Sequence, residues 1–287
     1  MLAKTPVTIV TGFLGAGKTT LIRHLLSHAG GRRLALIINE FGDVGVDGEL
    51  LKGCADAACP REAIIELANG CICCTVADDF APAVTALLAR EPRPDHIVVE
   101  TSGLALPKPL VKAFDWPDLR TKLTVDGVIA VVDAAAVAEG RFADDPARIA
   151  RQRAADPSLD HDNPLEEVYE DQLLCADLVL LNKADLVAPD ALERLRLEIA
   201  RSLPRAVKIA ATREGAIDPN VLLGVRAAAE DHLEARPSHH DAEGEHDHDD
   251  FDTFVVAIPA ARDPDALIDR LSEATQTHDI LRIKGFV

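Results

Sequence analysis

The sequence predicts an α/β fold in which a mostly parallel sheet is covered by helices on both faces. Short apolar runs alternate with amphipathic stretches of helical period along most of the 287 residues. The apolar runs are nearly continuous, which is typical of strands buried on both faces of a parallel sheet. Hydrophobic residues make up 48% of the chain but aromatic residues only 3%, so the core must consist of Ala, Val, Leu and Ile.

The expected elements follow from the order of these runs. Strands are expected over residues 7–10, 34–38, 64–67, 96–100, 125–133, 178–181 and 207–210. Helices are expected from residue 18 onward and over residues 80–89, 165–175, 189–203 and 221–233. The first of them would bury Leu21, Ile22, Leu25 and Leu26. Glycines at 42, 45 and 48 make residues 39–48 a loop. Residues 134–163 are polar and weakly periodic, and we interpret them as an insertion on the surface.

The first strand leads into a phosphate-binding loop pattern, G-x4-G-K-[ST], at residues 12–19. Glycines let backbone N–H groups turn toward phosphate oxygens, and the following helix directs its N-terminal dipole at them. Lys18 adds a cation, and the Thr19 hydroxyl can ligate Mg²⁺. The residues expected to contact the nucleotide here are Gly12, Gly15, Ala16, Gly17, Lys18, Thr19 and Thr20.

A guanine-recognition element, N-K-x-D, follows the strand at 178–181. It consists of Asn182, Lys183, Ala184 and Asp185. The Asp185 carboxylate can accept two parallel hydrogen bonds from guanine, and adenine lacks this donor pair. Residues 210–212 follow the next strand and could support the base through backbone amides. GTP is therefore the expected nucleotide, with ATP as the alternative.

Two strand ends carry candidates for the magnesium shell and the γ-phosphate sensor. Glu100 begins an E-T-S-G segment; it can hold the Mg²⁺ shell, and the Gly103 N–H can contact the γ-phosphate. Asp133 competes with Glu100 for the magnesium role, and it equally suits a cap on the following helix. Residues 39–43 are the expected first switch. The pattern offers no glutamine or arginine finger, so slow intrinsic hydrolysis is expected.

Three cysteines within four residues, Cys71, Cys73 and Cys74, form a candidate metal site. Their thiolates suit a soft or borderline cation such as Zn²⁺ or Co²⁺. The alternatives are a cluster of small buried side chains or a redox motif. The fourth ligand is open among Glu40, Cys54, Cys59, a histidine and water. Cys175 lies on an apolar helix face and is expected in the core.

Charge and composition exclude several partners. The net charge of −18 argues against nucleic acid and against an anionic membrane. The first residues do not resemble a signal peptide, and no apolar run reaches the roughly 20 residues needed to span a bilayer. A cytoplasmic location is therefore expected, where six cysteines favour metal or redox ligands over disulfides.

The composition divides the chain into three parts. Residues 1–235 form the nucleotide-binding domain with the cysteine site. Residues 236–252 are rich in His and Asp and are expected to be a disordered linker, which is either a weaker metal site or only a tether. Residues 253–287 have a β-α-β pattern that is too small for an independent core, so we expect a truncated domain or one completed elsewhere.

The motifs in this order resemble the CobW-type GTPases, nucleotide-dependent metallochaperones related to the nickel accessory GTPases of hydrogenase and urease. The resemblance covers residues 1–235 and includes N-E-F-G at 39–42 and G-C-I-C-C at 70–74. The segment at 153–161 resembles the branch associated with cobalt delivery for cobalamin synthesis.

The resemblance implies that Lys18 and Thr19 bind phosphate and Mg²⁺, that Asp185 binds guanine, and that Cys71, Cys73 and Cys74 bind the metal. It implies that Co²⁺ is the metal delivered, with a zinc-handling GTPase of the same family as the alternative. The metal would be released on GTP hydrolysis to a recipient protein, such as a cobalt chelatase. Two other functions stay open: a signalling GTPase with a static structural zinc, and a metal buffer that uses the histidine tract. The oligomeric state is not predicted by the sequence.

Overall fold

The computed structural model describes residues 4–39, 64–67, 80–143, 145–155 and 164–241, together with the isolated positions Leu267 and Arg270. The chain divides into two compact units, Met1–Ala242 and Glu243–Val287. Almost all of the described residues belong to the first unit. Apart from the two isolated positions, the predicted β-α-β region lies outside the described residues.

The first unit is built on a seven-stranded sheet with the order β3-β2-β4-β1-β5-β6-β7. All six strand pairs are parallel. The strands are β1 (Thr5–Thr11), β2 (Leu34–Asn39), β3 (Ile64–Leu67), β4 (His96–Glu100), β5 (Leu123–Asp133), β6 (Leu178–Asn182) and β7 (Lys208–Ala211). The four central strands β1, β4, β5 and β6 are almost entirely buried, as near-continuous apolar runs require.

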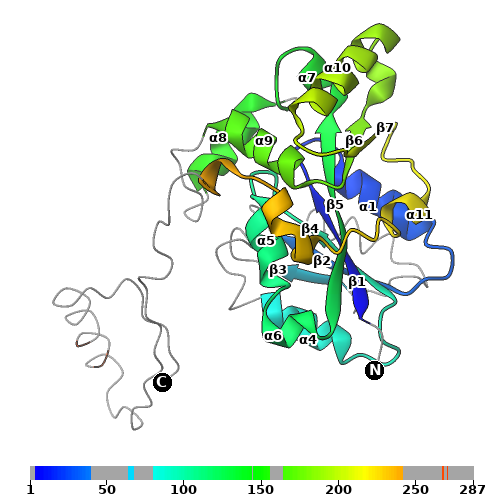
Figure 1. Cartoon of the computed structure of the whole chain (residues 1–287), viewed down its shortest axis with the longest axis vertical. Helices are drawn as coiled ribbons and strands as arrows, with labels where there is room; N and C mark the ends of the chain where they lie inside the picture. Colours follow the sequence, from blue (N-terminus) through cyan, green and yellow to red (C-terminus); the bar gives the residue numbers. More distant parts are fainter. Residues whose placement is uncertain are drawn as a thin grey trace. The chain divides into compact units, whose positions relative to one another are not determined.

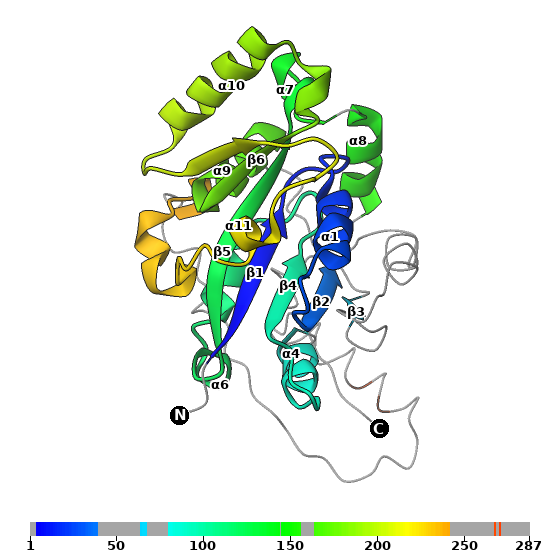
Figure 2. The ribbon, with the colours of Figure 1, turned by 90° about the vertical axis from the view of Figure 1, so that its right-hand side faces the viewer.

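Helices cover both faces of this sheet, which confirms the predicted fold class. Figure 1 shows α1 and α11 on one side of the sheet and α5 and α9 on the other, and Figure 2 shows the same layers from a second direction. The α-helices are α1 (Lys18–Ser27), α4 (Ala81–Leu88), α5 (Pro107–Ala113), α6 (Pro117–Arg120), α7 (Ala134–Ala138), α8 (Pro146–Ala155), α9 (Leu165–Cys175), α10 (Pro189–Ser202) and α11 (Pro219–Leu222). Among the described residues, no helix is long and apolar enough to cross a membrane.

The predicted helix over residues 221–233 is wrong. The chain forms only the short α11, then residues 224–228 without regular secondary structure, then the 3₁₀ segment η4 (Ala229–Ala235). The Asp126 carboxylate on β5 accepts hydrogen bonds from the backbone N–H groups of Val225 and Arg226, both at 3.1 Å. Arg226 and Ala228 also adopt positive φ angles of 57° and 46°, which no helix accommodates. A buried acceptor on the sheet therefore replaces the helical hydrogen bonds.

The interpretation of residues 134–163 as a surface insertion is also wrong for their described part. This part forms α7 and α8, and it buries Ala143 and Ile149, each 2% exposed. These side chains join a hydrophobic cluster with Phe13 of the phosphate-binding loop and Val168 of α9. The segment therefore packs beside the nucleotide end of the sheet.

Residues 236–241, which the sequence analysis placed in the linker, belong to the first unit and pack against the rest of it. Arg236 is buried, and its guanidinium donates hydrogen bonds to the Cys175 carbonyl and to the Asp177 carboxylate. Through Arg236 the chain therefore stays attached to the C-terminal end of α9.

Burial raises the pKa of the Cys175 thiol to about 12, so this thiol is an inert core group, as predicted.

A clamp on α9 and α5 holds the next residues, 238–241. The Ser238 hydroxyl and the backbone N–H of His239 donate to the Asp171 carboxylate at 2.6 and 3.0 Å. The Lys108 ammonium lies 2.5 Å from a carboxylate oxygen of Asp241. The imidazole of His239 lies 2.9 Å from Asp171, and this hydrogen bond raises the pKa of His239 above its ordinary value of 6.5.

We expect this clamp to loosen as the pH rises. Because docking raises the pKa of His239, its protonation stabilises the clamp fully below pH 6.5, and this contribution is lost as the pH passes through the raised pKa. Hydrogen exchange of the amides of residues 238–241, corrected for intrinsic rates, measures the effect between pH 5.5 and 8.5. The variant His239→Gln should show little pH dependence; equal pH dependence in both proteins would contradict the assignment.

Candidate functional site

The strand register brings the predicted functional groups to one edge of the sheet. Val10 of β1 is paired with Glu100 at the end of β4, and Asp133 of β5 is paired with Asn182 of β6. Because the strands are parallel, their carboxyl ends meet at this edge, where ligands of open α/β sheets bind.

The loop after β1 has the backbone geometry of a phosphate cradle. Gly12, Gly15 and Gly17 have φ angles of 136°, 78° and 102°, which disfavour any residue with a side chain. At Gly12 a Cβ atom would lie 2.1 Å from the Val131 carbonyl oxygen, so the loop is pressed directly onto β5. Helix α1 begins immediately afterwards at Lys18, and its first-turn N–H groups and dipole suit an anion.

Lys18 lies inside this cradle and is only 7% exposed. Its ammonium donates hydrogen bonds to the carbonyl oxygens of Gly12 at 2.8 Å and Phe13 at 3.2 Å. A buried cation held on backbone carbonyls is positioned to interact with phosphate oxygens with little side-chain ordering cost.

The structure brings together the two groups predicted for the magnesium shell. The Thr19 hydroxyl donates to Glu100 Oε1 at 3.0 Å, and the carboxylate is buried at the end of β4. Asp133 has the alternative role: its Oδ1 accepts from the N–H groups of Ala135 and Ala136 and so caps α7, while its Oδ2 lies 2.5 Å from the Lys183 ammonium. Of the two competitors, Glu100 is the one next to Thr19.

Gly103 lies against the phosphate-binding loop. A Cβ atom here would be 2.7 Å from the backbone nitrogen of Leu14, so only glycine allows this approach. The preceding Thr101 donates its backbone N–H to the Val10 carbonyl at 3.0 Å and its hydroxyl to Thr11 at 3.0 Å. The segment after β4 therefore continues beside the loop.

The Asn182 side chain connects the two halves of the nucleotide site. Its Nδ2 donates to the Ala16 carbonyl at 2.8 Å, and its Oδ1 accepts the Gly215 N–H at 3.1 Å. Gly215 (φ 66°) is pressed onto the first turn of α1, where a Cβ atom would lie 2.6 Å from the Cα of Leu21. The sequence analysis named residues 210–212 as possible support for the base but missed Gly215, although a glycine shortly after β7 was a usable signal.

Asp185 lies in the 3₁₀ turn η3 (Ala184–Leu186), directly after Lys183, which has a positive φ of 58°. The turn is held against the loop after β7 because the Ala184 N–H donates to the Thr212 carbonyl at 3.1 Å. The Asp185 carboxylate is 38% exposed and lies 3.7 Å from the exposed Arg213 guanidinium. A solvent-exposed pair of this kind contributes little, so Asp185 stays accessible to a base.

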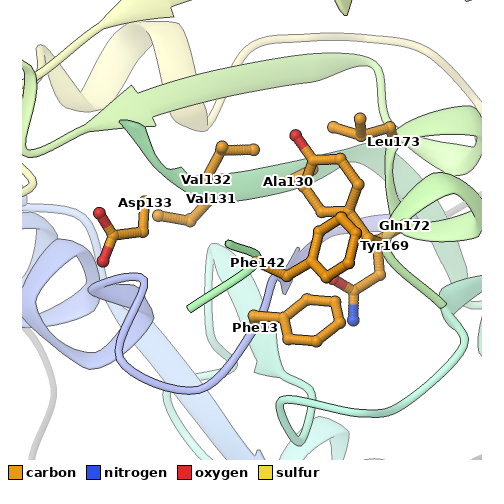
Figure 3. Close-up of a pocket in the computed structure, with 9 residues that line it drawn as sticks. All are labelled: Phe13, Ala130, Val131, Val132, Asp133, Phe142, Tyr169, Gln172 and Leu173. Carbon is orange, nitrogen blue, oxygen red and sulfur yellow. The ribbon is translucent and has the colours of Figure 1, made fainter. Parts of the chain in front are cut away.

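Aromatic side chains support the tip of the phosphate-binding loop. Figure 3 shows the rings of Phe13, Phe142 and Tyr169 gathered around a small pocket beside residues 130–133. The ring centroids of Phe13 lie 6.0 Å from Phe142 and 6.2 Å from Tyr169. Burial raises the pKa of the Tyr169 hydroxyl well above its ordinary value, so this group stays neutral.

The predicted metal ligands Glu40, Cys71, Cys73 and Cys74 lie outside the described residues, as do Cys54 and Cys59. Within the described part of the chain, no group of three His, Cys, Asp or Glu side chains could hold a metal ion. The structure does describe the two strand ends that precede these residues in the chain. Asn39, which precedes Glu40, is the last residue of β2, and it is paired with Leu67, the last residue of β3 before Cys71.

The phosphate-binding loop, the close approaches of Gly12, Gly103 and Gly215, and the base-recognition turn define a P-loop nucleotide-binding domain of the GTPase class. The chain belongs to the CobW/HypB/UreG nucleotide-binding domain family, whose model matches residues 6–210. The predicted resemblance to the CobW-type GTPase metallochaperones is thereby confirmed, as is GTPase activity.

Curated relatives match over nearly the whole chain. It is 55% identical over 287 residues to "Zinc chaperone CobW" of a Sinorhizobium species, covering 99% of this chain and 81% of the relative. It is 57% identical to "Zinc chaperone CobW" of Pseudomonas aeruginosa, covering 99% and 77%. A more distant relative, "Zinc-regulated GTPase metalloprotein activator 1" of Schizosaccharomyces pombe, is 34% identical over 74% of this chain and 47% of the relative.

We expect Asn182→Ala to weaken both nucleotide binding and the fold. The change removes two buried hydrogen bonds and leaves the Ala16 carbonyl and the Gly215 N–H without this partner, which costs about 1–3 kcal/mol of unfolding free energy per unsatisfied group. Denaturant unfolding and GDP titration measure both effects. Exposed Asn220, whose side chain bonds to Arg32 and Asp218, is a matched control as Asn220→Ala; equal losses in the two variants would contradict a special role for Asn182.

Proposed function

We propose that this chain is a GTP-dependent metallochaperone that binds Zn²⁺ through Cys71, Cys73 and Cys74 and releases it to a recipient protein when GTP is hydrolysed. The observation that carries the proposal is the arrangement of the strand ends. β2 and β3 end side by side, and β2 is the neighbour of β4, which carries Glu100.

The nucleotide roles follow from the geometry at the sheet edge. Lys18 and the backbone N–H groups of residues 12–20 hold the phosphates, and Asp185 accepts the guanine N–H groups. Thr19 and Glu100 hold Mg²⁺, which would neutralise charge on the β- and γ-phosphates. The Gly103 N–H contacts the γ-phosphate, since this residue already lies against the loop.

Chain length limits how far the cysteines can lie from this edge. Cys71 is four residues beyond Leu67, so its Cα lies within about 14 Å of the end of β3. Glu40 follows directly after Asn39, at the end of the neighbouring strand. The proposed first switch, residues 39–43, therefore begins at the end of the strand next to the one that precedes the cysteines.

Zinc is the proposed cargo in preference to cobalt. Two relatives more than 50% identical to this chain have names that describe a zinc chaperone. Thiolate ligands also bind zinc more tightly than cobalt under free competition. The recipient is then a protein that requires zinc, and the predicted cobalt chelatase of cobalamin synthesis becomes the alternative recipient if cobalt is the cargo.

We expect Asp185→Asn to change the base preference. An amide cannot accept both guanine N–H groups, but it can donate to the 2-oxo group of xanthine, so GTP turnover falls while xanthosine triphosphate becomes a substrate. The ratio of kcat/KM for the two nucleotides should shift by at least about 100-fold, which corresponds to roughly 2.7 kcal/mol. Equal hydrolysis of ATP and GTP by the unmodified protein would contradict the guanine assignment.

We expect metal affinity to depend on the nucleotide. With Mg²⁺ and a non-hydrolysable GTP analogue, zinc should bind about 5–150-fold more tightly than with GDP, the range of a coupling of about 1–3 kcal/mol. Competition titration measures zinc, and Co²⁺ is a visible probe because thiolate-to-cobalt charge transfer absorbs light. The absorption should be lost when Cys71, Cys73 and Cys74 are changed to Ser, and it should persist in Cys175→Ala.

Two results separate this proposal from the alternatives. Equal zinc affinity with the GTP analogue and with GDP would leave a GTPase with a static metal site. Loss of most metal binding on deletion of residues 242–252, with the three cysteines intact, would indicate a buffer that uses the histidine tract. Single changes of Cys54, Cys59 and Glu40 identify the fourth ligand.

A further inference from the structure

A buried amide on α9 holds the segment that follows β4. Gln172 is 2% exposed, and its Nε2 donates hydrogen bonds to the carbonyl oxygens of Gly103 at 3.2 Å and Ala105 at 3.3 Å. Between these two carbonyls lies Leu104, which is 4% exposed and packs in the same hydrophobic cluster as Phe13. The Gln172 side chain therefore fixes the backbone on both sides of the buried Leu104.

The same segment is confined from the opposite side by the phosphate-binding loop. At Gly103 a Cβ atom would lie 2.7 Å from the Leu14 nitrogen, so the segment lies so close to the loop that no side chain fits between them. A shift away from the loop breaks the Gln172 hydrogen bonds and withdraws Leu104 from its cluster. The position of the Gly103 N–H is thus set by Gln172 as well as by the loop.

Helix α9 also supports the loop itself. Tyr169, one turn before Gln172, packs against Phe13, and both residues line the pocket in Figure 3. Because α9 contacts the tip of the loop and the Gly103 segment, it fixes their relative position. A change on α9 can therefore displace one of the two while leaving the other in place.

We propose that Gln172 is a positioning residue for GTP hydrolysis, which acts by holding the Gly103 N–H at the position of the γ-phosphate. This inference rests on the proposed contact between Gly103 and the γ-phosphate. Gln172 is buried and directs its amide at backbone carbonyls, so it acts through Gly103 and not on the nucleotide itself. Its effect should therefore appear in steps that involve the γ-phosphate and be small for GDP binding.

The test compares two substitutions of similar size. Gln172→Met keeps the volume but has no donor, and Gln172→Glu directs a carboxylate at two carbonyl oxygens. We expect kcat for GTP to fall at least about 10-fold in both variants, while the Kd of GDP changes less than about twofold. The ratio of the affinity for a non-hydrolysable GTP analogue to the affinity for GDP should fall in the same variants in which kcat falls. Glu166→Gln, which changes an exposed side chain on the same helix, should leave all three values unchanged.

The pH dependence of Gln172→Glu distinguishes positioning from a general loss of structure. Burial raises the pKa of such a carboxyl group, and its protonated form regains one donor. The ratio of its kcat to that of the unmodified protein should therefore rise at least about threefold between pH 8 and pH 6, while the same ratio for Gln172→Met stays flat. This comparison needs no assumption about the absolute stability of either variant.

Three outcomes decide the inference. Unchanged kcat in Gln172→Met would overturn it. A parallel loss of GDP affinity and kcat with a flat pH ratio in Gln172→Glu would also overturn it, because it would indicate a purely structural role. Normal hydrolysis by Gly103→Ala, in which a Cβ atom meets Leu14, would instead contradict the proposed role of Gly103 and leave Gln172 without a group to position.

Discussion

The nucleotide end of the sheet depends on close backbone approaches that only glycine allows, and Asn182 is fixed by one of them. At Gly17 a Cβ atom would lie 2.2 Å from the Asn182 Nδ2, so the asparagine side chain fills the space that a larger residue would occupy. From there it binds the phosphate-binding loop through Ala16 and the loop after β7 through Gly215. Phosphate and base recognition are thus connected by one buried amide, and neither loop can shift without losing a hydrogen bond.

Strands and long helices were predictable because their signals are local. The runs at 64–67, 96–100 and 165–175 begin and end in the structure at the predicted residues, since apolar period and flanking turns fix each independently. The segment at 221–233 shows where local signals fail. Its apolar spacing fits a helix, but the decisive acceptor, Asp126, lies about a hundred residues earlier in the chain. The prediction for residues 134–155 was wrong for a related reason, because Ala143 and Ile149 are buried in a cluster with Phe13 and Val168, which lie elsewhere in the chain.

In the candidate site, too, the residues of local motifs could be predicted from the sequence, whereas roles that depend on tertiary contacts could not. The phosphate-binding pattern and N-K-x-D predict Lys18 and Asp185 as site residues from residue type and spacing alone. The competition between Glu100 and Asp133 could not be decided in this way, because both are carboxylates at strand ends. The structure separates them by their surroundings: Asp133 is occupied by the first turn of α7 and by Lys183, whereas Glu100 accepts the Thr19 hydroxyl.

Helix α9 relates the nucleotide site to the start of the C-terminal region. Gln172 holds the segment after β4, and its neighbour Asp171 holds residues 238–239 on another side of the same helix. The next helix in the chain after Gly103, α5, contributes Lys108 to Asp241. The residues that lead out of the first unit are therefore attached to the helix that carries Gln172 and to the helix that follows the Gly103 segment in the chain. Both attachments are charge-assisted hydrogen bonds, so a movement of either helix relative to residues 238–241 would lengthen at least one of them.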